Sequence, residues 1–161
     1  MVPDMDLPQR GHLPHNIPLW VDPQKEVYYL TINCQRRGLN HLATPNMGKA
    51  LLETIEFRHR QNLWFAYLFL VMPDHVHGLV SFPPSSRTLQ GVVSDWKRWT
   101  ACHLQIEWQK DFFEHRLRRD ESAREKSDYI LTNPVRAKLV VRPEDWPYVW
   151  FGESPLRTER G

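Results

Sequence analysis

Two histidines stand two residues apart in the stretch Met72-Pro73-Asp74-His75-Val76-His77-Gly78. Alternate side chains of a β-strand project from the same face, so a strand here places the imidazoles of His75 and His77 side by side. Imidazole is the commonest metal ligand among protein side chains, and Gly78 allows another group to approach the backbone closely. The same pair also suits an ordinary strand with surface or packed histidines. The spacing therefore predicts a candidate metal site and leaves the packed-histidine interpretation open.

A tyrosine further along the chain has the spacing to serve such a site. Lys126, Tyr129 and Asn133 fall at i−3, i and i+4 of a predicted helix, so they share one face. A phenol on that face could reach a metal bound on the sheet. Core packing with a satisfied hydroxyl explains Tyr129 equally well, and Asn133 also suits a helix end before Pro134. Both interpretations stay open at this point.

Four predicted strands and three predicted helices position these side chains. Runs rich in β-branched and aromatic residues predict strands over 27–33, 63–72, 75–82 and 112–117. Apolar spacing and capping residues predict helices that begin at Thr44-Pro45-Asn46, run over 86–109, and extend from Asp120 or Ser122 to Asn133. The order β-α-β-β-α-β is that of the ferredoxin-like split unit, an α+β fold with two helices on one face of a four-stranded antiparallel sheet. We expect the other face to be free for a ligand, with the added C-terminal helix carrying Tyr129.

The length of 161 residues fits a single domain. Five prolines and the lack of a sustained period make 1–26 an irregular N-terminal arm, followed by the folded domain over 27–141. Residues 142–161 form a tail rich in aromatic residues and proline. Its Trp146, Tyr148 and Trp150 could stack on unpaired bases, but such a tail more often packs over a core, and we favour packing.

The composition excludes several classes of protein. Two cysteines are too few for a disulfide framework or a cysteine-rich zinc site, so a reducing cytoplasm is expected. No apolar run has the length of a membrane span, and the N-terminus lacks a signal-peptide pattern. The net charge of +2 divides into −2 over 1–26, +5 over 27–141 and −1 over 142–161. A basic centre suits a phosphate-bearing partner, and an ordinary solvated surface is the alternative.

Four motifs together resemble a known family, the REP-associated tyrosine transposases, which belong to the single-tyrosine HUH transposase and relaxase-like nucleases. The motifs are Pro73-Asp74-His75-Val76-His77-Gly78, Phe112-Phe113-Glu114-His115-Arg116-Leu117-Arg118, Asp128-Tyr129-Ile130-Leu131-Thr132-Asn133-Pro134-Val135-Arg136 and Pro143-Glu144-Asp145-Trp146-Pro147. The resemblance covers roughly residues 27–151 and makes 27–141 an HUH transposase domain. A His-x-His pair is common in proteins, whereas four motifs in the family's order are hard to obtain by chance.

The resemblance implies a metal-dependent endonuclease and strand transferase that acts on single-stranded DNA near hairpin repeats. His75 and His77 would be the metal ligands for Mg²⁺ or Mn²⁺, and Tyr129 the nucleophile that forms a 5′-phosphotyrosine. Related insertion-sequence transposases have a glutamine one turn after the tyrosine. Asn133 stands there in this chain and is assigned as third ligand, with His115 as the alternative. The family commonly has glycine where Lys138 stands, which puts a tight left-handed turn there in doubt.

Basic side chains are candidate contacts for DNA phosphates, because neutralised phosphates supply much of DNA affinity. The candidates are Lys97, Arg98, Arg116, Arg118 and Arg119. We expect single-stranded or hairpin DNA as the partner, no membrane, and a monomer or homodimer. The alternatives are a nucleic-acid-binding module on the same fold that has lost catalysis and, third, a metal-dependent enzyme for a small molecule.

Overall fold

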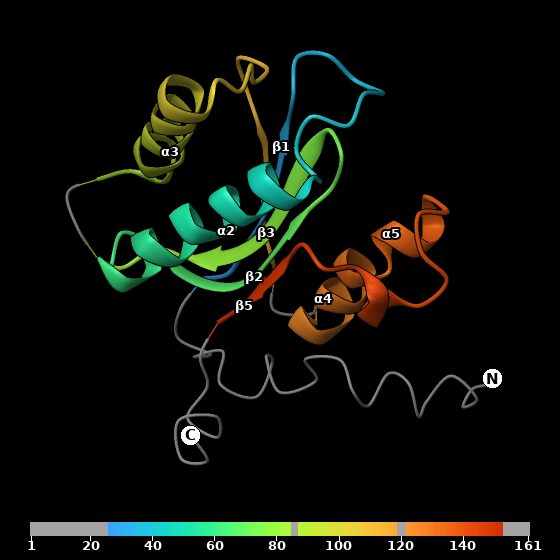
Figure 1. Cartoon of the computed structure of the whole chain (residues 1–161). Helices are drawn as coiled ribbons and strands as arrows, with labels where there is room; N and C mark the ends of the chain where they lie inside the picture. The colour runs from blue at the N-terminus through green and yellow to red at the C-terminus, as the bar shows by residue number, and fades with distance from the viewer. Residues whose placement is uncertain (1–25, 85–86, 119–121, 153–161) are drawn as a thin grey trace.

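The computed structural model describes residues 26–84, 87–118 and 122–152. Its elements in chain order are β1 (Tyr28–Asn33), α2 (Pro45–Arg60), β2 (Phe65–Val71), β3 (His75–Ser81), α3 (Leu89–Leu104), β4 (Phe113–Arg116), α4 (Ala123–Leu131), α5 (Asn133–Arg136), a 3₁₀ turn η2 (Pro143–Asp145) and β5 (Val149–Phe151) (Figure 1). Nearly all of the expected N-terminal arm, together with Arg119 and Asp120, lies outside the described residues.

The strands form one antiparallel sheet in the order β4-β1-β3-β2-β5. The expected β-α-β-β-α-β order and α+β class are confirmed, and β3 lies at the middle of the sheet. The expected count of four strands is wrong, because Val149–Phe151 adds a fifth strand beside β2. A three-residue strand is too short to display alternation, so this part of the aromatic tail gave no strand signal.

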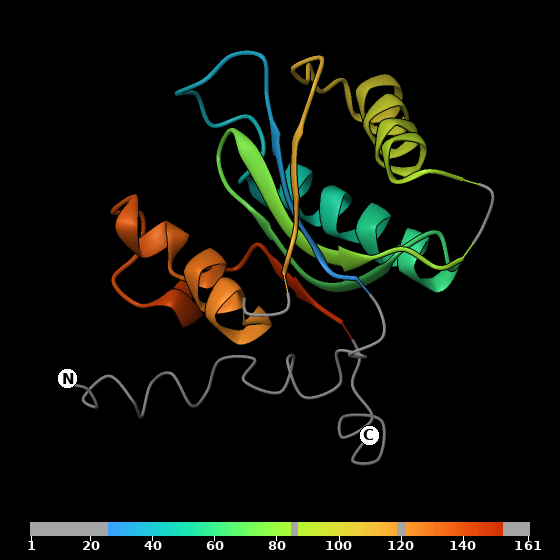
Figure 2. The same ribbon diagram turned by 180° about the vertical axis from the view of Figure 1, so that it is seen from behind.

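Helices cover both faces of the sheet (Figures 1 and 2). On one face, α2 and α3 bury a core that includes Leu30 and Ile32 of β1, Val76 of β3 and the indoles of Trp64 and Trp96. The expectation that the opposite face is free is wrong in part. There Ile130 and Leu131 of α4 pack in a second apolar cluster with Leu68, Leu70 and Leu79 of β2 and β3. The apolar residues of α4 need this burial, so the helix is fixed against the sheet.

Local signals set the helix ends. The hydroxyls of Thr44 and Ser122 accept hydrogen bonds from the first turns of α2 and α4, as their capping positions predict. Helix α3 ends at Leu104 and does not reach Gln109, because Gln105 adopts a left-handed conformation with φ 60°. Lys138 also adopts φ 63°. The left-handed turn after α5 therefore forms without the glycine.

The aromatic tail packs against the sheet, as favoured above. Trp146 donates its indole N–H to the Val71 carbonyl oxygen over 2.9 Å. The ring of Tyr148 lies where a side chain at Gly48 would stand, and Trp150 joins the core beneath α2. The three rings are half-buried, which leaves little of them for stacking on bases.

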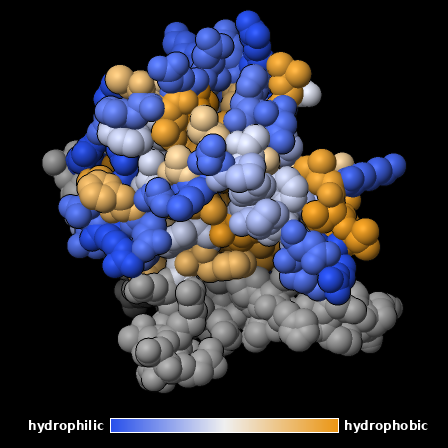
Figure 3. All heavy atoms as spheres, viewed as in Figure 1, coloured by the Kyte–Doolittle hydropathy of each residue, from blue (hydrophilic) through white to orange (hydrophobic). Residues whose placement is uncertain are grey.

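The surface is mostly polar, with apolar side chains gathered over α5 in the view of Figure 3. Leu139 and Val141 follow α5 and are exposed. None of the helices in the described ranges has the length and apolar character needed to cross a membrane.

Gly78 illustrates how tightly β3 is packed, since the ring of Phe69 on β2 lies against it. A Cβ at Gly78 would stand 2.6 Å from the Phe69 ring, well inside van der Waals contact. We expect Gly78→Ala to lower the free energy of unfolding by about 1–3 kcal/mol, measured by urea denaturation. Gly91→Ala, in the first turn of α3, is the matched control and should change it by less than about 1 kcal/mol. Equal effects would contradict this packing.

Candidate functional site

The two imidazoles predicted to share a face do so. The rings of His75 and His77 have centroids 4.7 Å apart and planes at 81°. They project from β3 on the α4 side of the sheet, opposite Asn33 and Thr31 of β1. His77 is buried, with 6% of its surface exposed.

One nitrogen of each imidazole is held by a hydrogen-bonding neighbour. His75 Nδ1 lies 2.8 Å from Asp74 Oδ1. His77 Nδ1 lies 3.2 Å from the Tyr29 hydroxyl and 3.1 Å from Thr31 Oγ1. The Asp74 carboxylate can only accept, so it holds the proton of His75 on Nδ1 and leaves Nε2 with the lone pair. The hydroxyls of Tyr29 and Thr31 hold the orientation of the His77 ring, and either the ring or a hydroxyl can donate there.

Asp74 connects this site to the loop after β1. Arg37 Nε donates a hydrogen bond to Asp74 Oδ2 over 2.9 Å. The Gly38 backbone N–H donates to the same oxygen over 2.7 Å. Burial acts to raise the pKa of Asp74, but the hydrogen bonds from Arg37, Gly38 and His75 outweigh it and hold the pKa far below its ordinary value. Asp74 is therefore a carboxylate throughout the neutral range and a stable acceptor for His75 Nδ1.

Burial keeps both imidazoles neutral. It lowers the pKa of His75, against the opposing effect of Asp74. Burial is also the main cause that lowers the pKa of His77 to about 3, with smaller contributions from repulsion by His75 when it is protonated and by Arg136. Neutral imidazole is the form that binds metal ions, so the pair is in its ligating state at neutral pH.

Tyr129 lies on α4 and is 51% exposed, so the packed-core interpretation of this residue is wrong. Cations approach its ring, with Arg136 Cζ 4.1 Å and Lys126 Nζ 5.5 Å from the centroid. Burial is the main cause that raises the pKa of Tyr29, and Tyr129 contributes to the shift. Lys126 Nζ also lies 4.8 Å from the centroid of the Tyr29 ring, so one ammonium group contacts both tyrosines.

The two candidates for a third ligand differ in position. Asn133 begins α5 one turn after Tyr129 and is half-buried. His115 lies on β4 and pairs with Tyr29 of β1. Strand β1 therefore lies between His115 and the histidines of β3. Two strand spacings amount to about 10 Å, which is a long reach for the His115 side chain. Pro134 does not end the helical segment but stands in the first turn of α5.

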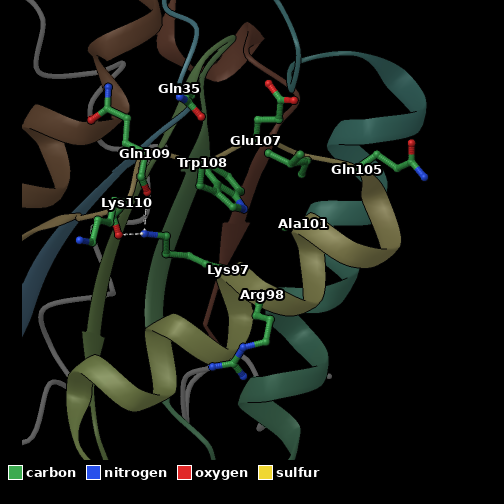
Figure 4. A pocket seen from close by; sticks show the side chains of 10 residues that line it. Gln35, Lys97, Arg98, Ala101, Gln105, Glu107, Trp108, Gln109 and Lys110 are labelled. Atoms are coloured by element: carbon green, nitrogen blue, oxygen red, sulfur yellow. Dashed lines mark hydrogen bonds between the residues drawn. The ribbon is translucent and has the colours of Figure 1, made fainter.

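The structure does not gather the basic candidates around the histidines. Lys97 and Arg98 lie on α3, which covers the opposite face, and line a groove of about 690 Å³ beside the loop after α3 (Figure 4). Lys97 Nζ donates to the Gln109 and Lys110 carbonyl oxygens, and Arg98 pairs with Asp95. Arg116 lies on the edge strand β4 and pairs with Glu26. Arg118 follows that strand and is exposed, and Arg119 lies outside the described residues.

Several residues at the site carried no role in the sequence-based prediction. Tyr29, Thr31 and Arg136 reach it through strand register and helix packing, which local sequence does not reveal. Asp74 precedes His75 directly, so an acidic neighbour beside a candidate ligand was an available signal.

Two neutral imidazoles held at Nδ1 are a partial ligand set for a divalent ion. Within the described ranges, no three His, Cys, Asp or Glu side chains cluster for a metal. An amide oxygen such as that of Asn133 is one that Mg²⁺ and Mn²⁺ accept.

Comparison with known proteins points to one family. A REP-associated tyrosine transposase of Escherichia coli is 30% identical over 138 residues, which cover 81% of this chain and 79% of the relative. A relative of the same family from Haemophilus influenzae is 29% identical over 143 residues, covering 78% of this chain and 79% of its own. A solved structure of a REP-associated tyrosine transposase bound to a REP hairpin matches with a TM-score of 0.65 and 28% identity over 78% of this chain and 76% of its own. No protein-family model matches the sequence.

The neutral state of His77 has a consequence for stability. Its folded pKa is about 3 against an ordinary value of 6.5, so the unfolded chain binds a proton first as the pH falls. The folded state therefore keeps its full stability above the ordinary pKa of 6.5, and it loses stability as the pH drops toward the folded pKa of about 3. In metal-free protein we expect the free energy of unfolding to fall by about 2 kcal/mol between pH 6.5 and 5 from this residue.

Urea denaturation of the wild type and His77→Gln across this pH range measures the difference. The wild type should lose more stability than the variant as the pH drops. His41→Gln, at an exposed position, is the control and should behave as the wild type. The same pH dependence in all three proteins would contradict a buried neutral His77.

Proposed function

The chain belongs to the REP-associated tyrosine transposase family, and we propose that it nicks and rejoins single-stranded DNA beside hairpin repeats through a phosphotyrosine at Tyr129. The observation that carries the proposal is the pair of neutral, oriented imidazoles on β3 with an exposed phenol on the helix that packs over the same face. The hairpin bound in the related structure makes hairpin DNA the substrate to test.

In this proposal His75 and His77 would hold the ion through their imidazoles, and the Asn133 side chain would supply an oxygen ligand. When bound, Mg²⁺ or Mn²⁺ would polarise the scissile phosphate and stabilise the charge that develops on its oxygens. Asp74, Tyr29 and Thr31 hold the imidazoles in the orientation that ligation needs.

Tyr129 supplies the nucleophile. Its hydroxyl oxygen attacks the scissile phosphorus, the new O–P bond replaces the bond to the 3′-oxygen, and the phenol loses its proton to solvent. The leaving 3′-oxygen takes up a proton and becomes a 3′-hydroxyl, while the 5′ side stays linked to Tyr129. The phosphotyrosine keeps the phosphodiester energy, so attack by a 3′-hydroxyl reverses the step and joins strands.

We propose that the nucleophile and the histidines that act together come from the same chain. Lys126 lies over the rings of both Tyr129 and Tyr29, and the Tyr29 hydroxyl lies beside His77, all within one copy. On this ground a monomer is proposed to be sufficient for cleavage.

Among the basic candidates, Arg116 and Arg118 are the described residues that we propose for phosphate contacts, with Arg119 continuing the same segment. Arg116 pairs with Tyr28 at the edge of the sheet, and Tyr28 packs on the α2–α3 side, so Arg116 projects from the face opposite the histidines. It would meet a strand of DNA that passes around this edge. Lys97 is less suited, because its ammonium group already serves two backbone carbonyls.

A covalent adduct tests the proposed chemistry. With a labelled hairpin oligonucleotide and Mn²⁺, we expect the wild type to form a protein–DNA adduct resistant to denaturation, resolved by gel electrophoresis. Tyr129→Phe should form none while binding the oligonucleotide with similar affinity, because it lacks only the hydroxyl. Tyr148→Phe removes the hydroxyl of a tyrosine in the tail. It is the matched control and should form the adduct as the wild type does.

The alternative of a binding module without catalysis predicts a different result. In that case all three proteins bind the oligonucleotide and none forms an adduct. An adduct that persists in Tyr129→Phe would show that another residue is the nucleophile.

The third ligand is tested by its side chain. We expect Asn133→Ala to lower the adduct rate about 10–100-fold and to raise the Mn²⁺ concentration needed for half-maximal rate, because one ligand is lost. Asn133→Gln keeps the amide and should retain more activity than the alanine variant. His115→Ala should leave the Mn²⁺ requirement unchanged. The opposite ranking would assign the ligand to His115.

A further inference from the structure

We propose that Lys126 is a positioning residue that holds Tyr129 against the sheet beside His77. The inference rests on the proposed function, because it assigns a role to a neighbour of the proposed nucleophile. The observation behind the inference is that the Lys126 ammonium group lies over two aromatic rings, which belong to two different elements of the fold.

Lys126 makes the direct link between α4 and β1. Its Nζ lies 4.8 Å from the centroid of the Tyr29 ring on β1 and 5.5 Å from that of Tyr129 on its own helix. Both distances are within the roughly 6 Å over which an ammonium is attracted to an aromatic face. The rings of Tyr29 and Tyr129 are therefore both within reach of one ammonium group.

Tyr29 carries this link on to the metal site. Its ring is stacked on His77 with centroids 5.6 Å apart and planes at 16°, and its hydroxyl lies 3.2 Å from His77 Nδ1. A shift of Lys126 that moves Tyr29 also moves a partner of His77. The order Tyr129, Lys126, Tyr29, His77 thus connects the proposed nucleophile to a proposed ligand.

Helix geometry explains the placement. Lys126 stands three residues before Tyr129, so the two side chains are neighbours on one face of α4. The adjacent Ser127 and the later Ile130 and Leu131 are buried and fix the helix on the sheet. Tyr129 itself is half exposed and needs contacts at its ring to keep a single orientation.

Arg136 differs from Lys126 in what it touches. Its guanidinium lies over the Tyr129 ring and donates to the Tyr129 carbonyl oxygen and to Thr132 Oγ1. These contacts all belong to the α4–α5 segment, although the charge of Arg136 also lowers the pKa of Tyr29 and of His77. Lys126 is the described cation whose ammonium group lies over both the Tyr129 ring and the Tyr29 ring of the sheet.

The test compares adduct formation in single turnover at saturating oligonucleotide and Mn²⁺, which removes any effect on DNA affinity. We expect Lys126→Met to slow the reaction about tenfold and Lys126→Arg to restore most of the rate, because the charge returns. Lys49→Met removes an exposed lysine of α2, on the opposite face, and should react as the wild type. Urea denaturation of each variant confirms that it is folded.

Repeating the Lys126→Met measurement in two Tyr29 variants separates a positioning role of Lys126 from a general effect of its charge. Tyr29→Phe keeps the ring, so Lys126→Met should still slow the reaction there. Tyr29→Leu removes the ring, and in that background Lys126→Met should cost clearly less than tenfold, since the two changes break one link.

The outcomes distinguish this inference from the proposed function. A normal wild-type adduct with an unaffected Lys126→Met, or an equal effect in the Tyr29→Leu background, overturns the role of Lys126 alone. Failure of Lys126→Arg to recover activity also counts against it. Absence of any adduct from the wild type overturns the proposed function and this inference with it.

Discussion

Along β3, the middle strand of the sheet, successive side chains point to opposite faces. Val76, Gly78 and Val80 face α2 and α3, where Gly78 gives room to the ring of Phe69. His75 and His77 face α4. A shift of one residue in the register would bury the histidines under α2 and α3 and expose the valines, so the packing of the core also fixes the orientation of the site.

Two charged imidazoles on a largely buried surface would lower the stability of the fold, and their surroundings keep them neutral. Burial holds both neutral, while Asp74 stays ionised because Arg37 and the Gly38 backbone support it. The result is a pair of candidate ligands whose Nδ1 atoms already have hydrogen-bonding partners. Such preorganisation avoids the entropy cost of ordering the rings on binding. The exposed phenol of Tyr129 completes the arrangement from the helix above.

The sequence could predict those parts of the molecule that depend on local pattern. The periods of the strands and helices predicted the order of elements along the chain, and the His-x-His spacing predicted that the two rings share one face. The fifth strand escaped prediction because Val149–Phe151 is paired by tertiary contact with β2, without a period of its own. The partners Tyr29 and Thr31 depend on the register between β1 and β3, which no local pattern encodes. The same limit applies to Lys97 and Arg98. Their positive charge is evident from the sequence, but the sequence does not show that they lie on the face of the sheet opposite the histidines.

Peptide mapping by mass spectrometry after reaction with a hairpin oligonucleotide tests the central claim most directly. Trypsin cuts after Lys126 and Arg136, and the peptide over 127–136 contains Tyr129 as its single tyrosine. A strand-transfer site at Tyr129 predicts that this peptide gains the mass of a 5′-phosphorylated nucleotide fragment, and only when Mn²⁺ or Mg²⁺ is present. Cleaved DNA with an unmodified 127–136 peptide, or a nucleotide attached to a different peptide, would contradict it.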